Sequence, residues 1–555
     1  MRLITFLYIT NFFTGAIIMV VELLGTRLMA PCFGTGLYVW TALITVTLVS
    51  LAIGYRTGGW LADRFPRADL LYGLIFGAGV LLLLILLLRR PVLLWGVRFN
   101  LAWGALATAT ILFGPPLFLL GTVAPYSVKL CAAEFGRLGS VVGRLYAIST
   151  LGSFVGTVGA GFLFLPNFSN VTTLVMCAAA LAVLAALYFG FFRTRVLPVC
   201  GAAIVLGIAI FIAWRSAGAL PRGTLTTLVE WRTLEQRNGF YGTISVVDLG
   251  TPVNEQWHRR FLLNDGLTQG SYEPARRIPA AVFPYALCDL VLAHAPRLER
   301  VLVLGLGAGF VPAMLKPLIA RPDDDPARTR ANFVVVEINP AMVDIAARWF
   351  DFPPEEFTIV IEDARTWVST YRVGPDAPPF DAIIVDTFLG DNTPGHLLTH
   401  EMFAELKRIL APGGALAMNV FGSIRGPRSR LLAALVRTLG EPRGGPPLFP
   451  HVQVFSQEAT AIAHNVYLLA SGDPGARRPD GILRIVVPHL DAHDPADDFH
   501  KEAMRSLRDQ TSLLAGVPDA PVLTDDYAVA DHLDIAVKEE IRRNIVKSWG
   551  EMLLE

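Results

Sequence analysis

Seven apolar stretches, each about as long as a lipid bilayer is thick, lie within the first 215 residues and constrain the fold more than any other feature. They centre on residues 4–24, 38–60, 70–88, 101–123, 143–165, 171–192 and 197–214. The first carries Glu22, lacks a clear small-residue cleavage site and is followed by further spans, so it is not a cleaved signal peptide. Residues 1–215 are therefore predicted to form a polytopic α-helical membrane domain.

Composition indicates two unlike halves and excludes several classes of function. A chain of 555 residues is too long for one ordinary domain. Hydrophobic residues make up 53% and charged residues only 17%, which is a soluble composition averaged with a far more apolar one. The 47 basic and 47 acidic residues balance, so no nucleic-acid partner is expected. The five cysteines include no CxxC pair, and no metal is expected.

Two polar features of the membrane half bear on transport. Glu22 is costly inside a span, and Arg27 lies little more than a helical turn away. A structural ion pair is the simpler interpretation, and a substrate or proton path is the alternative. Residues 52–67, AIGYRTGGWLADRFPR, resemble the loop between the second and third helices of major-facilitator transporters. Seven spans are nevertheless too few for a complete alternating-access carrier.

The basic residues at the loop ends bear on orientation. If the N-terminus is inside, nine basic residues lie inside and six outside. The inner set is Arg2, Arg56, Arg64, Arg67, Lys129, Arg137, Arg144, Arg193 and Arg195, and the outer set is Arg27, Arg89, Arg90, Arg98, Arg215 and Arg222. With seven spans this bias would export the C-terminal half, whereas a nucleoside cofactor made in the cytosol argues the opposite. We expect a multi-pass protein of the cell (inner) membrane with a cytoplasmic soluble domain, its orientation being left open.

From Gly218 the chain reads as soluble. FYGTISVVD at 240–248 alternates as a strand does, and RRFLLNDG at 259–266 ends a second strand on an Asp-Gly turn, which predicts a β-hairpin layer within a segment 216–298. Five further strands, separated by helical stretches, are predicted at 301–305, 333–337, 357–361, 380–386 and 414–420. This alternation is typical of a parallel, doubly wound α/β domain of the Rossmann type. We assign it residues 299–480 and expect a helical extension at 481–555.

The ends of the first two of these strands carry a nucleoside-binding pattern. Gly305, Gly307 and Gly309 in VLVLGLGAGF let the backbone approach a ligand and open a helix whose amides face it. Glu337 ends the next strand, where a carboxylate can accept both hydroxyls of a ribose. A tight structural turn and a solvated acid are the competing interpretations.

The next two strand ends complete the pattern. Glu362, Asp363 and Ala364 close the third strand, where a carboxylate can accept the exocyclic amine of adenine while backbone amides meet the ring. Asp386 ends the fourth strand, where it could hold an attacking amine or remove its proton. The long loop that follows, TFLGDNTPGHLLTHEMF, is able to cover the site. One candidate residue on each of four strands is far more specific than any residue alone.

These residues resemble a known family. From about Tyr241 to Gly422 the chain is similar to the spermidine synthase superfamily of polyamine aminopropyltransferases, through YGTISVVD, LLNDGLTQ, VLVLGLGAG, VVEINP, EDAR and FDAIIVDTF. With its apolar spans and a C-terminal LTDDYA, the whole chain resembles the membrane-fused spermidine synthase-like proteins. The resemblance implies decarboxylated S-adenosylmethionine as donor. It further implies that Gln269, Glu337 and Asp363 bind the nucleoside and that Asp386 activates the amine.

Three positions depart from the family pattern. Ala308 stands where soluble spermidine synthases carry an Asp in the glycine loop, and YAL at Tyr285 replaces a Tyr-His-Glu segment that helps to hold the diamine. Leu389 stands at the second Asp of the strand-four signature, with Asp391 two residues later. Tyr285 and Asp391 remain the candidate substrate-binding residues. Because the loop lacks the amine-binding Asp, it also suits ordinary S-adenosylmethionine, which would make the enzyme a methyltransferase or an aminocarboxypropyltransferase.

Several alternatives stay open. The acceptor is an amine or a membrane-associated molecule, the lipid bilayer is a partner, and a homodimer is a further candidate assembly. A non-catalytic membrane sensor or transporter of nucleosides or polyamines is the competing class of function. Residues 524–527, TDDY, either reach back over the site or cap the C-terminal helix, and capping is the simpler expectation.

Overall fold

The computed structural model describes residues 3–553 except 136–137, 194–195, 217–219, 227–228, 252–253, 295–297, 320–331, 389–392, 444, 458–462, 473–501, 503–505, 519 and 528. The chain separates into two compact units. The helical unit comprises Met1–Pro221, Gln236–Ile244 and Ile545–Glu555, and the sheet unit comprises Arg222–Glu235 and Ser245–Asn544.

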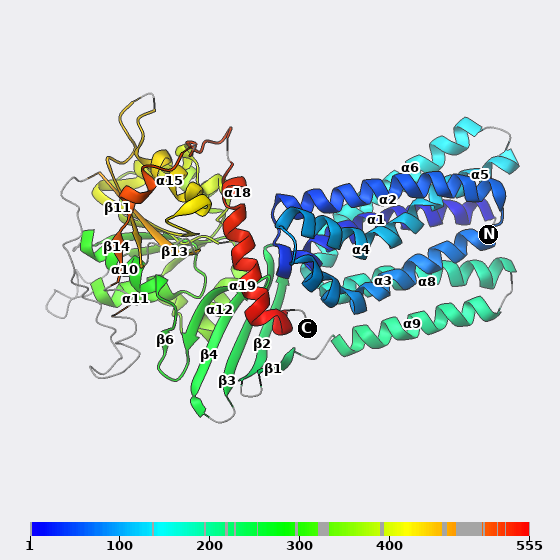
Figure 1. Cartoon of the computed structure of the whole chain (residues 1–555), viewed down its shortest axis with the longest axis horizontal. Coiled ribbons are helices and arrows are strands. Elements are labelled where there is room, and N and C mark those ends of the chain that lie inside the picture. Colours follow the sequence, from blue (N-terminus) through cyan, green and yellow to red (C-terminus); the bar gives the residue numbers. More distant parts are fainter. Residues whose placement is uncertain are drawn as a thin grey trace. The chain divides into compact units, whose positions relative to one another are not determined.

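The helical unit is a bundle of long apolar helices (Figure 1). Its elements are α1 (Leu3–Phe33), α2 (Leu37–Arg64), α3 (Ala68–Gly96), α4 (Leu101–Gly121), α5 (Val123–Phe135), α6 (Leu138–Gly159), α7 (Leu165–Asn167), α8 (Asn170–Tyr188) and α9 (Val196–Ser216), with π-helical turns at Ala160–Phe164 and Phe189–Arg193. By length and composition, six helical stretches among the described residues could cross a membrane: Leu3–Phe33, Leu37–Arg64, Ala68–Gly96, Leu101–Cys131, Gly139–Asn167 and Asn170–Arg193.

The seventh predicted stretch is not among these six. It forms α9, a helix of 21 residues whose described apolar part is Pro198–Ile212. The six longer stretches are compatible with a membrane protein.

Small residues allow the helices of this bundle to approach closely. A Cβ at Gly152 or Gly156 of α6 would lie 2.0 or 2.3 Å from backbone oxygens of α1, so only glycine permits this approach. One buried polar pair joins two helices, since the Asn11 side chain of α1 donates to Ser127 Oγ of α5 at 2.8 Å. Arg27, the predicted partner of Glu22, donates to the carbonyl of Leu165 at 2.9 Å.

The first sheet of the chain has six strands in sequence order. They are β1 (Arg222–Thr226), β2 (Val229–Gly239), β3 (Gly242–Thr251), β4 (Asn254–Asn264), β5 (Leu267–Glu273) and β6 (Ile278–Pro279). The two strands of the predicted hairpin are β3 and β4 of this larger sheet. Asp265 and Gly266 join β4 to β5 with φ of 47° and 80°, the left-handed conformation that Asp-Gly favours in tight hairpin turns.

The second sheet has eight strands in the order β14-β12-β13-β11-β10-β7-β8-β9. They are β7 (Arg300–Leu304), β8 (Asn332–Glu337), β9 (Thr358–Ile361), β10 (Phe380–Val385), β11 (Leu410–Gly422), β12 (His451–Ser456), β13 (His464–Ser471) and β14 (Arg508–Asp509). Strands β9, β8, β7, β10 and β11 are parallel, whereas β13 is antiparallel to β11 and β12 is antiparallel to β13.

The sheet is therefore mixed, and the prediction of a wholly parallel sheet is wrong at one edge. The five parallel strands lie where the sequence predicts them. Their order reverses between β7 and β10, which is the position where open α/β sheets bind ligands. Apart from the two-residue edge strand β14, the strand order, with β13 reversed beside β11, is that of a methyltransferase-like Rossmann fold.

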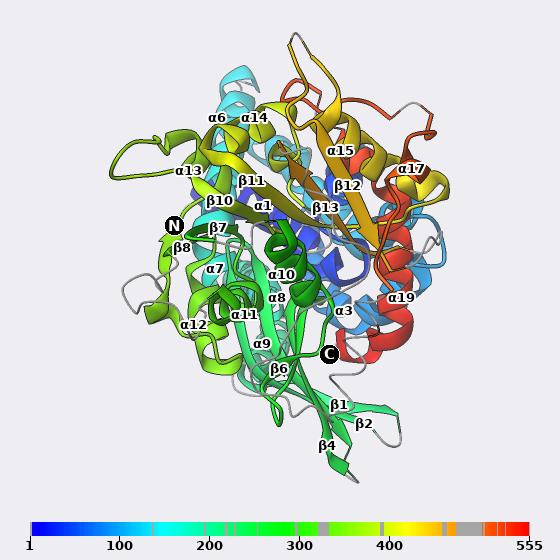
Figure 2. The ribbon, with the colours of Figure 1, turned by 90° about the vertical axis from the view of Figure 1, so that its left-hand side faces the viewer.

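Helices and a C-terminal segment cover the second sheet (Figure 2). The helices are α10 (Phe283–His294), α11 (Phe310–Ile319), α12 (Pro340–Trp349), α13 (Ala364–Thr370), α14 (His400–Ile409), α15 (Arg430–Gly440), α17 (Thr511–Leu514) and α18 (Ala530–Leu533). Helix α19 (Ile535–Leu553) follows them in the chain. One core cluster joins strand residues such as Ile383 to Leu432 of α15 and to Leu523 of the C-terminal segment. Because these side chains are fully buried, each contributes about 1.5–3 kcal/mol of hydrophobic stabilisation.

Candidate functional site

The three glycines after β7 have three different environments. Gly305 has a φ of 90°, and a Cβ there would lie 2.3 Å from the carbonyl oxygen of Asp386. Gly309 has a φ of 77°, and a Cβ there would lie 2.6 Å from the ring of Phe352. Gly307 has a φ of 54° but faces open space. The first and third glycines permit packing, while the middle one leaves room for a ligand against the backbone.

Glu337, at the end of β8, holds this loop. Its Oε2 accepts a hydrogen bond from the amide of Leu306 at 2.9 Å, and its Oε1 accepts one from the amide of Asn339 at 2.8 Å. Burial of the side chain, which is 7% exposed, raises the pKa of Glu337, and the backbone amides around it offset this only in part. The carboxylate proposed for the ribose therefore also fixes the shape of the glycine loop.

Asp363 follows β9 and caps the short helix α13. Its Oδ1 accepts a hydrogen bond from the amide of Thr366 at 3.0 Å, and its Oδ2 lies 3.1 Å from Nε2 of His396. Burial raises the pKa of Asp363, but the Thr366 amide and His396 outweigh it, so the pKa lies below its usual range. Ala364 is the buried first residue of the helix. The sequence did not indicate His396, which is 33 positions away.

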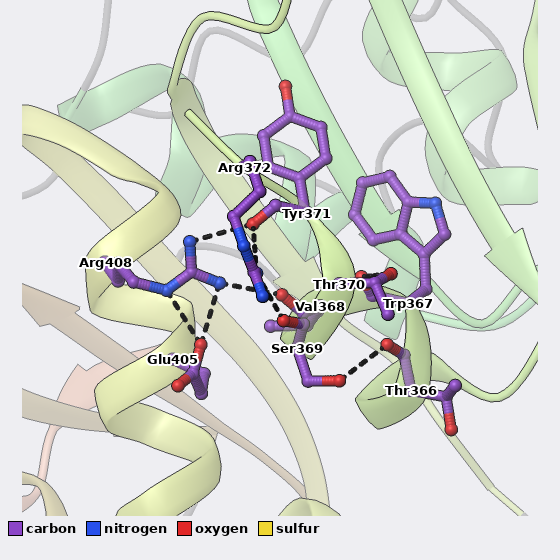
Figure 3. Close-up of polar contacts among 9 residues, drawn as sticks. All are labelled: Thr366, Trp367, Val368, Ser369, Thr370, Tyr371, Arg372, Glu405 and Arg408. Atoms are coloured by element: carbon purple, nitrogen blue, oxygen red, sulfur yellow. Dashed lines mark hydrogen bonds and ion pairs between the residues drawn. The ribbon is translucent and has the colours of Figure 1, made fainter. Parts of the chain in front are cut away.

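The other end of α13 is held by an arginine of α14 (Figure 3). Arg408 donates to the carbonyls of Tyr371 at 2.8 Å and Val368 at 2.9 Å, and it pairs with Glu405. An arginine at a helix C-terminus satisfies the last carbonyls and complements the helix dipole. The helix that begins at Asp363 is thus fixed at both ends.

Asp386 follows β10, directly against the glycine loop. Its amide donates to the carbonyl of Leu304 at 2.9 Å, and its Oδ1 accepts a hydrogen bond from Nδ2 of Asn419 at 2.9 Å. Burial raises the pKa of Asp386 to about 6, and the bond from Asn419 lowers it in part. A carboxylate with such a pKa can accept a proton near neutral pH.

Asn419 is a component of the site that sequence analysis missed. It lies on β11 and is 3% exposed, and its Oδ1 has no hydrogen-bond partner within the described part of the chain. Thr387 Oγ1, next to Asp386, is likewise buried without such a partner there. A lone asparagine within the apolar run ALAMNVF was the signal that could have revealed it.

The remaining predicted residues lie at different depths. Gln269 is partly buried on β5 and donates to the carbonyl of Leu267 at 3.5 Å. Its neighbour Gly270 packs beside Ala308, since a Cβ there would lie 3.4 Å from that of Ala308. Tyr285 is buried in α10, and its hydroxyl donates to the carbonyl of Pro279 at 3.0 Å. Asp391 lies outside the described residues.

The C-terminal segment TDDY reaches the site instead of capping a helix. Asp525 forms a two-bond ion pair with Arg365 of α13, and the expectation of capping is wrong for this residue. Folding brings Asp525 beside α13, although 160 positions separate it from Arg365 in the sequence. Among the residues that the structure describes, no group of three or more His, Cys, Asp or Glu side chains could hold a metal ion.

The geometry thus defines a methyltransferase-like Rossmann domain with acidic residues at successive strand ends. No protein-family model matches the chain. A polyamine aminopropyltransferase of Vibrio vulnificus is 36% identical over 143 residues, which are 25% of this chain and 44% of that protein. An N-terminal histidine N-methyltransferase of Emericella nidulans is 28% identical over 335 residues, 56% of each chain.

One solved structure also matches part of the chain. A probable spermidine synthase from Corynebacterium glutamicum covers 53% of this chain and 95% of its own, with 18% identity and a TM-score of 0.38. The chain spans about half the length of the curated relatives it matches. The chain is similar to polyamine aminopropyltransferases and to a methyltransferase, and the relatives of both kinds are named as transferases.

Proposed function

We propose that the protein is a membrane-bound transferase that moves an aminopropyl group from decarboxylated S-adenosylmethionine to an amine acceptor. The proposal rests on the position of Asp386 and on the pKa of its carboxyl group. Its backbone abuts Gly305 of the glycine loop, and burial raises the pKa of its carboxyl to about 6. A base with such a pKa, placed beside a nucleoside-binding loop, suits removal of a proton from an attacking amine.

The reaction needs little besides positioning and a base. The amine nitrogen attacks the carbon by which the aminopropyl group is bonded to the sulfonium sulfur. A C–N bond forms while the bond between this carbon and sulfur breaks. The sulfur keeps the electron pair and leaves as methylthioadenosine, and the proton on nitrogen passes to Asp386. Holding the two reactants in line provides much of the rate enhancement.

The proposed donor site uses the other strand ends. Glu337 accepts the ribose hydroxyls, Asp363 accepts the adenine amine and the amide of Ala364 meets the ring, while Gln269 binds the nucleoside from β5. The hydrogen bond from the Glu362 amide to the Glu337 carbonyl, 3.1 Å long, supports this arrangement because it joins the two strand ends.

The test uses the full chain purified in detergent. Decarboxylated S-adenosylmethionine is supplied with a diamine or with vesicles containing the aminolipid phosphatidylethanolamine, and methylthioadenosine is measured by mass spectrometry. We expect release by the wild type and none by Asp386→Asn, which should still bind methylthioadenosine. A wild type that binds neither methylthioadenosine nor S-adenosylhomocysteine would overturn the proposal.

Ordinary S-adenosylmethionine is the second candidate donor, and Ala308 favours it. This buried residue packs beside Gly270 and offers no carboxylate to the donor's amine. The methyltransferase relative points the same way. When ordinary S-adenosylmethionine replaces the decarboxylated donor in this assay, release of S-adenosylhomocysteine would identify methyl transfer, and release of methylthioadenosine would identify aminocarboxypropyl transfer. A non-catalytic sensor or transporter would instead retain its flux in Asp386→Asn.

We place the sheet unit in the cytoplasm and the helical unit in the inner membrane. Six spans, an even number, would return the chain to the side of its N-terminus, and six described stretches are long and apolar enough to span. Arg215 and Arg222 then join the inner set of basic residues, which strengthens the bias that orients the bundle. Labelling of a cysteine introduced into the sheet unit, compared between intact and lysed cells, tests on which side of the membrane this unit lies.

A further inference from the structure

Arg365 is the side chain at which three separate segments meet beside the proposed adenine position. It is the second residue of α13, two positions after Asp363. Both of its terminal nitrogens bind the carboxylate of Asp525, with Nη1 and Oδ1 2.7 Å apart. Nη1 also donates to the carbonyl of His396 at 2.9 Å and lies 3.4 Å from Oγ1 of Thr399. One guanidinium therefore joins α13, the end of the loop after β10 and the C-terminal segment.

The C-terminal segment is fixed to the domain core independently of this ion pair. The Leu523 amide donates to Thr438 Oγ1 at 2.9 Å, and the Leu523 carbonyl accepts a hydrogen bond from the His400 amide at 2.8 Å. The Asp525 amide donates to Glu401 Oε2 at 3.0 Å. These hydrogen bonds hold the backbone next to Asp525 in place, so its carboxylate faces Arg365 from a fixed position.

The loop after β10 is held at its far end by the same helix. The loop begins after Asp386, and its described residues 393–399 return to α13, where His396 Nε2 lies 3.1 Å from Asp363 Oδ2. Arg365 holds the backbone of His396 while Asp363 holds its ring. The orientation of the Asp363 carboxylate therefore depends on where Arg365 holds this loop.

We infer that Arg365 is a positioning residue for the donor nucleoside and that Asp525 is its anchor. The inference rests on the proposed function, since it takes Asp363 as the group that accepts the adenine amine. A guanidinium meets a carboxylate through two parallel bonds, a geometry that a lysine cannot reproduce. Because the two side chains are 28% and 41% exposed, the pair contributes little to global stability, and its effect falls on local geometry.

A double-mutant cycle on the full chain in detergent tests the coupling. Arg365→Gln, Asp525→Asn and the double variant are compared for binding of methylthioadenosine and S-adenosylhomocysteine by titration calorimetry, with thermal unfolding measured on each. We expect each single variant to bind about fivefold to tenfold more weakly and the double variant to lose no more than either single one. The unfolding temperatures should stay close to that of the wild type. Arg365→Lys should recover only part of the affinity.

Lys316→Met is the matched control, since it breaks a similarly exposed ion pair, Lys316 with Glu356, at 27% and 52%. It should leave nucleoside binding within about twofold of the wild type. Three results would overturn the inference: single variants that bind like the wild type, losses that add in the double variant, or an equal loss in Lys316→Met. A wild type that binds neither nucleoside overturns the proposed function itself, so the two failures are distinguishable.

Discussion

The proposed donor and acceptor ends of the candidate site are built differently. At the donor end, both oxygens of Glu337 and both of Asp363 interact with groups of the protein itself. At the acceptor end, Asp386 takes a bond from Asn419, while Asn419 Oδ1 and Thr387 Oγ1 are buried without partners among the described residues. The donor end is therefore preorganised, whereas the acceptor end keeps a raised proton affinity and unused hydrogen-bonding capacity.

The strongest test of this contrast removes the charge at the acceptor end. Asp386→Asn keeps the size of the side chain but cannot accept a proton, so we expect turnover to fall by about a thousandfold. Donor binding should change by less than about twofold because the donor carboxylates are untouched. Product release and nucleoside titration measure the two effects separately. Turnover close to that of the wild type would exclude Asp386 as the base.

A second test sharpens the contrast at the point where the two ends touch. Gly305→Ala forces a left-handed alanine against the carbonyl of Asp386, so we expect a loss of about 3 kcal/mol in stability. Gly307→Ala is the control, because its φ is also positive but its Cβ would face open space. It should lose only about 1 kcal/mol. Thermal unfolding of both variants decides the matter, and equal losses would contradict this account of the loop.

A third test disturbs the donor end alone. Glu337→Gln turns one acceptor oxygen into an amide that faces a backbone N–H, so we expect nucleoside affinity to fall about thirtyfold. Glu356→Gln, at a partly exposed acid with no place in the proposed site, serves as the control. Titration with methylthioadenosine measures the change. Unaltered affinity would show that preorganisation by Glu337 does not matter for binding.

The smallest effect is a pH dependence that belongs to the acceptor end. With the pKa of Asp386 near 6, activity should fall about tenfold for each pH unit below that value and level off above pH 7. The effect on stability has the opposite sign. Burial raises the pKa of Asp386 in the folded protein above the ordinary value of 3.8. The stabilisation of the folded state by the protonated Asp386 is therefore fully present below about pH 3.8 and is lost as the pH rises through about 6. The Asp386→Asn variant should not lose this stability as the pH rises. Unfolding temperatures of the wild type and the variant, measured across this pH range, test the difference.

Local pattern was enough to predict the parallel part of the fold. Short apolar runs between helical stretches marked β7, β8, β9, β10 and β11, and the carboxyl ends of β8, β9 and β10 carry the predicted acids. The reversed edge was missed because its pairing is distant: Asn419 of β11 lies opposite Tyr467 of β13. Nothing in the local pattern of either strand specifies that partner or its direction.

The same limit applies to the candidate site. A residue that ends a strand can be predicted, as for Glu337 and Asp386, because strand ends of a parallel sheet meet at one edge. His396 and Asp525 could not be predicted, since each reaches α13 through a loop or a terminal segment whose path depends on tertiary packing. Composition marked six stretches that form helices long and apolar enough to cross a membrane, and a seventh stretch that forms α9.

The ion pair between Arg365 and Asp525 joins residues 160 positions apart and has a consequence for biosynthesis. The ribosome delivers the apolar helices before the glycine loop, and the glycine loop before the turn that carries Asp525. A nascent chain can therefore form its apolar helices and its parallel strands while α13 still lacks its anchor. Under the proposed role of Arg365, tight nucleoside binding begins only once that turn has been translated, so unfinished chains would not sequester the donor.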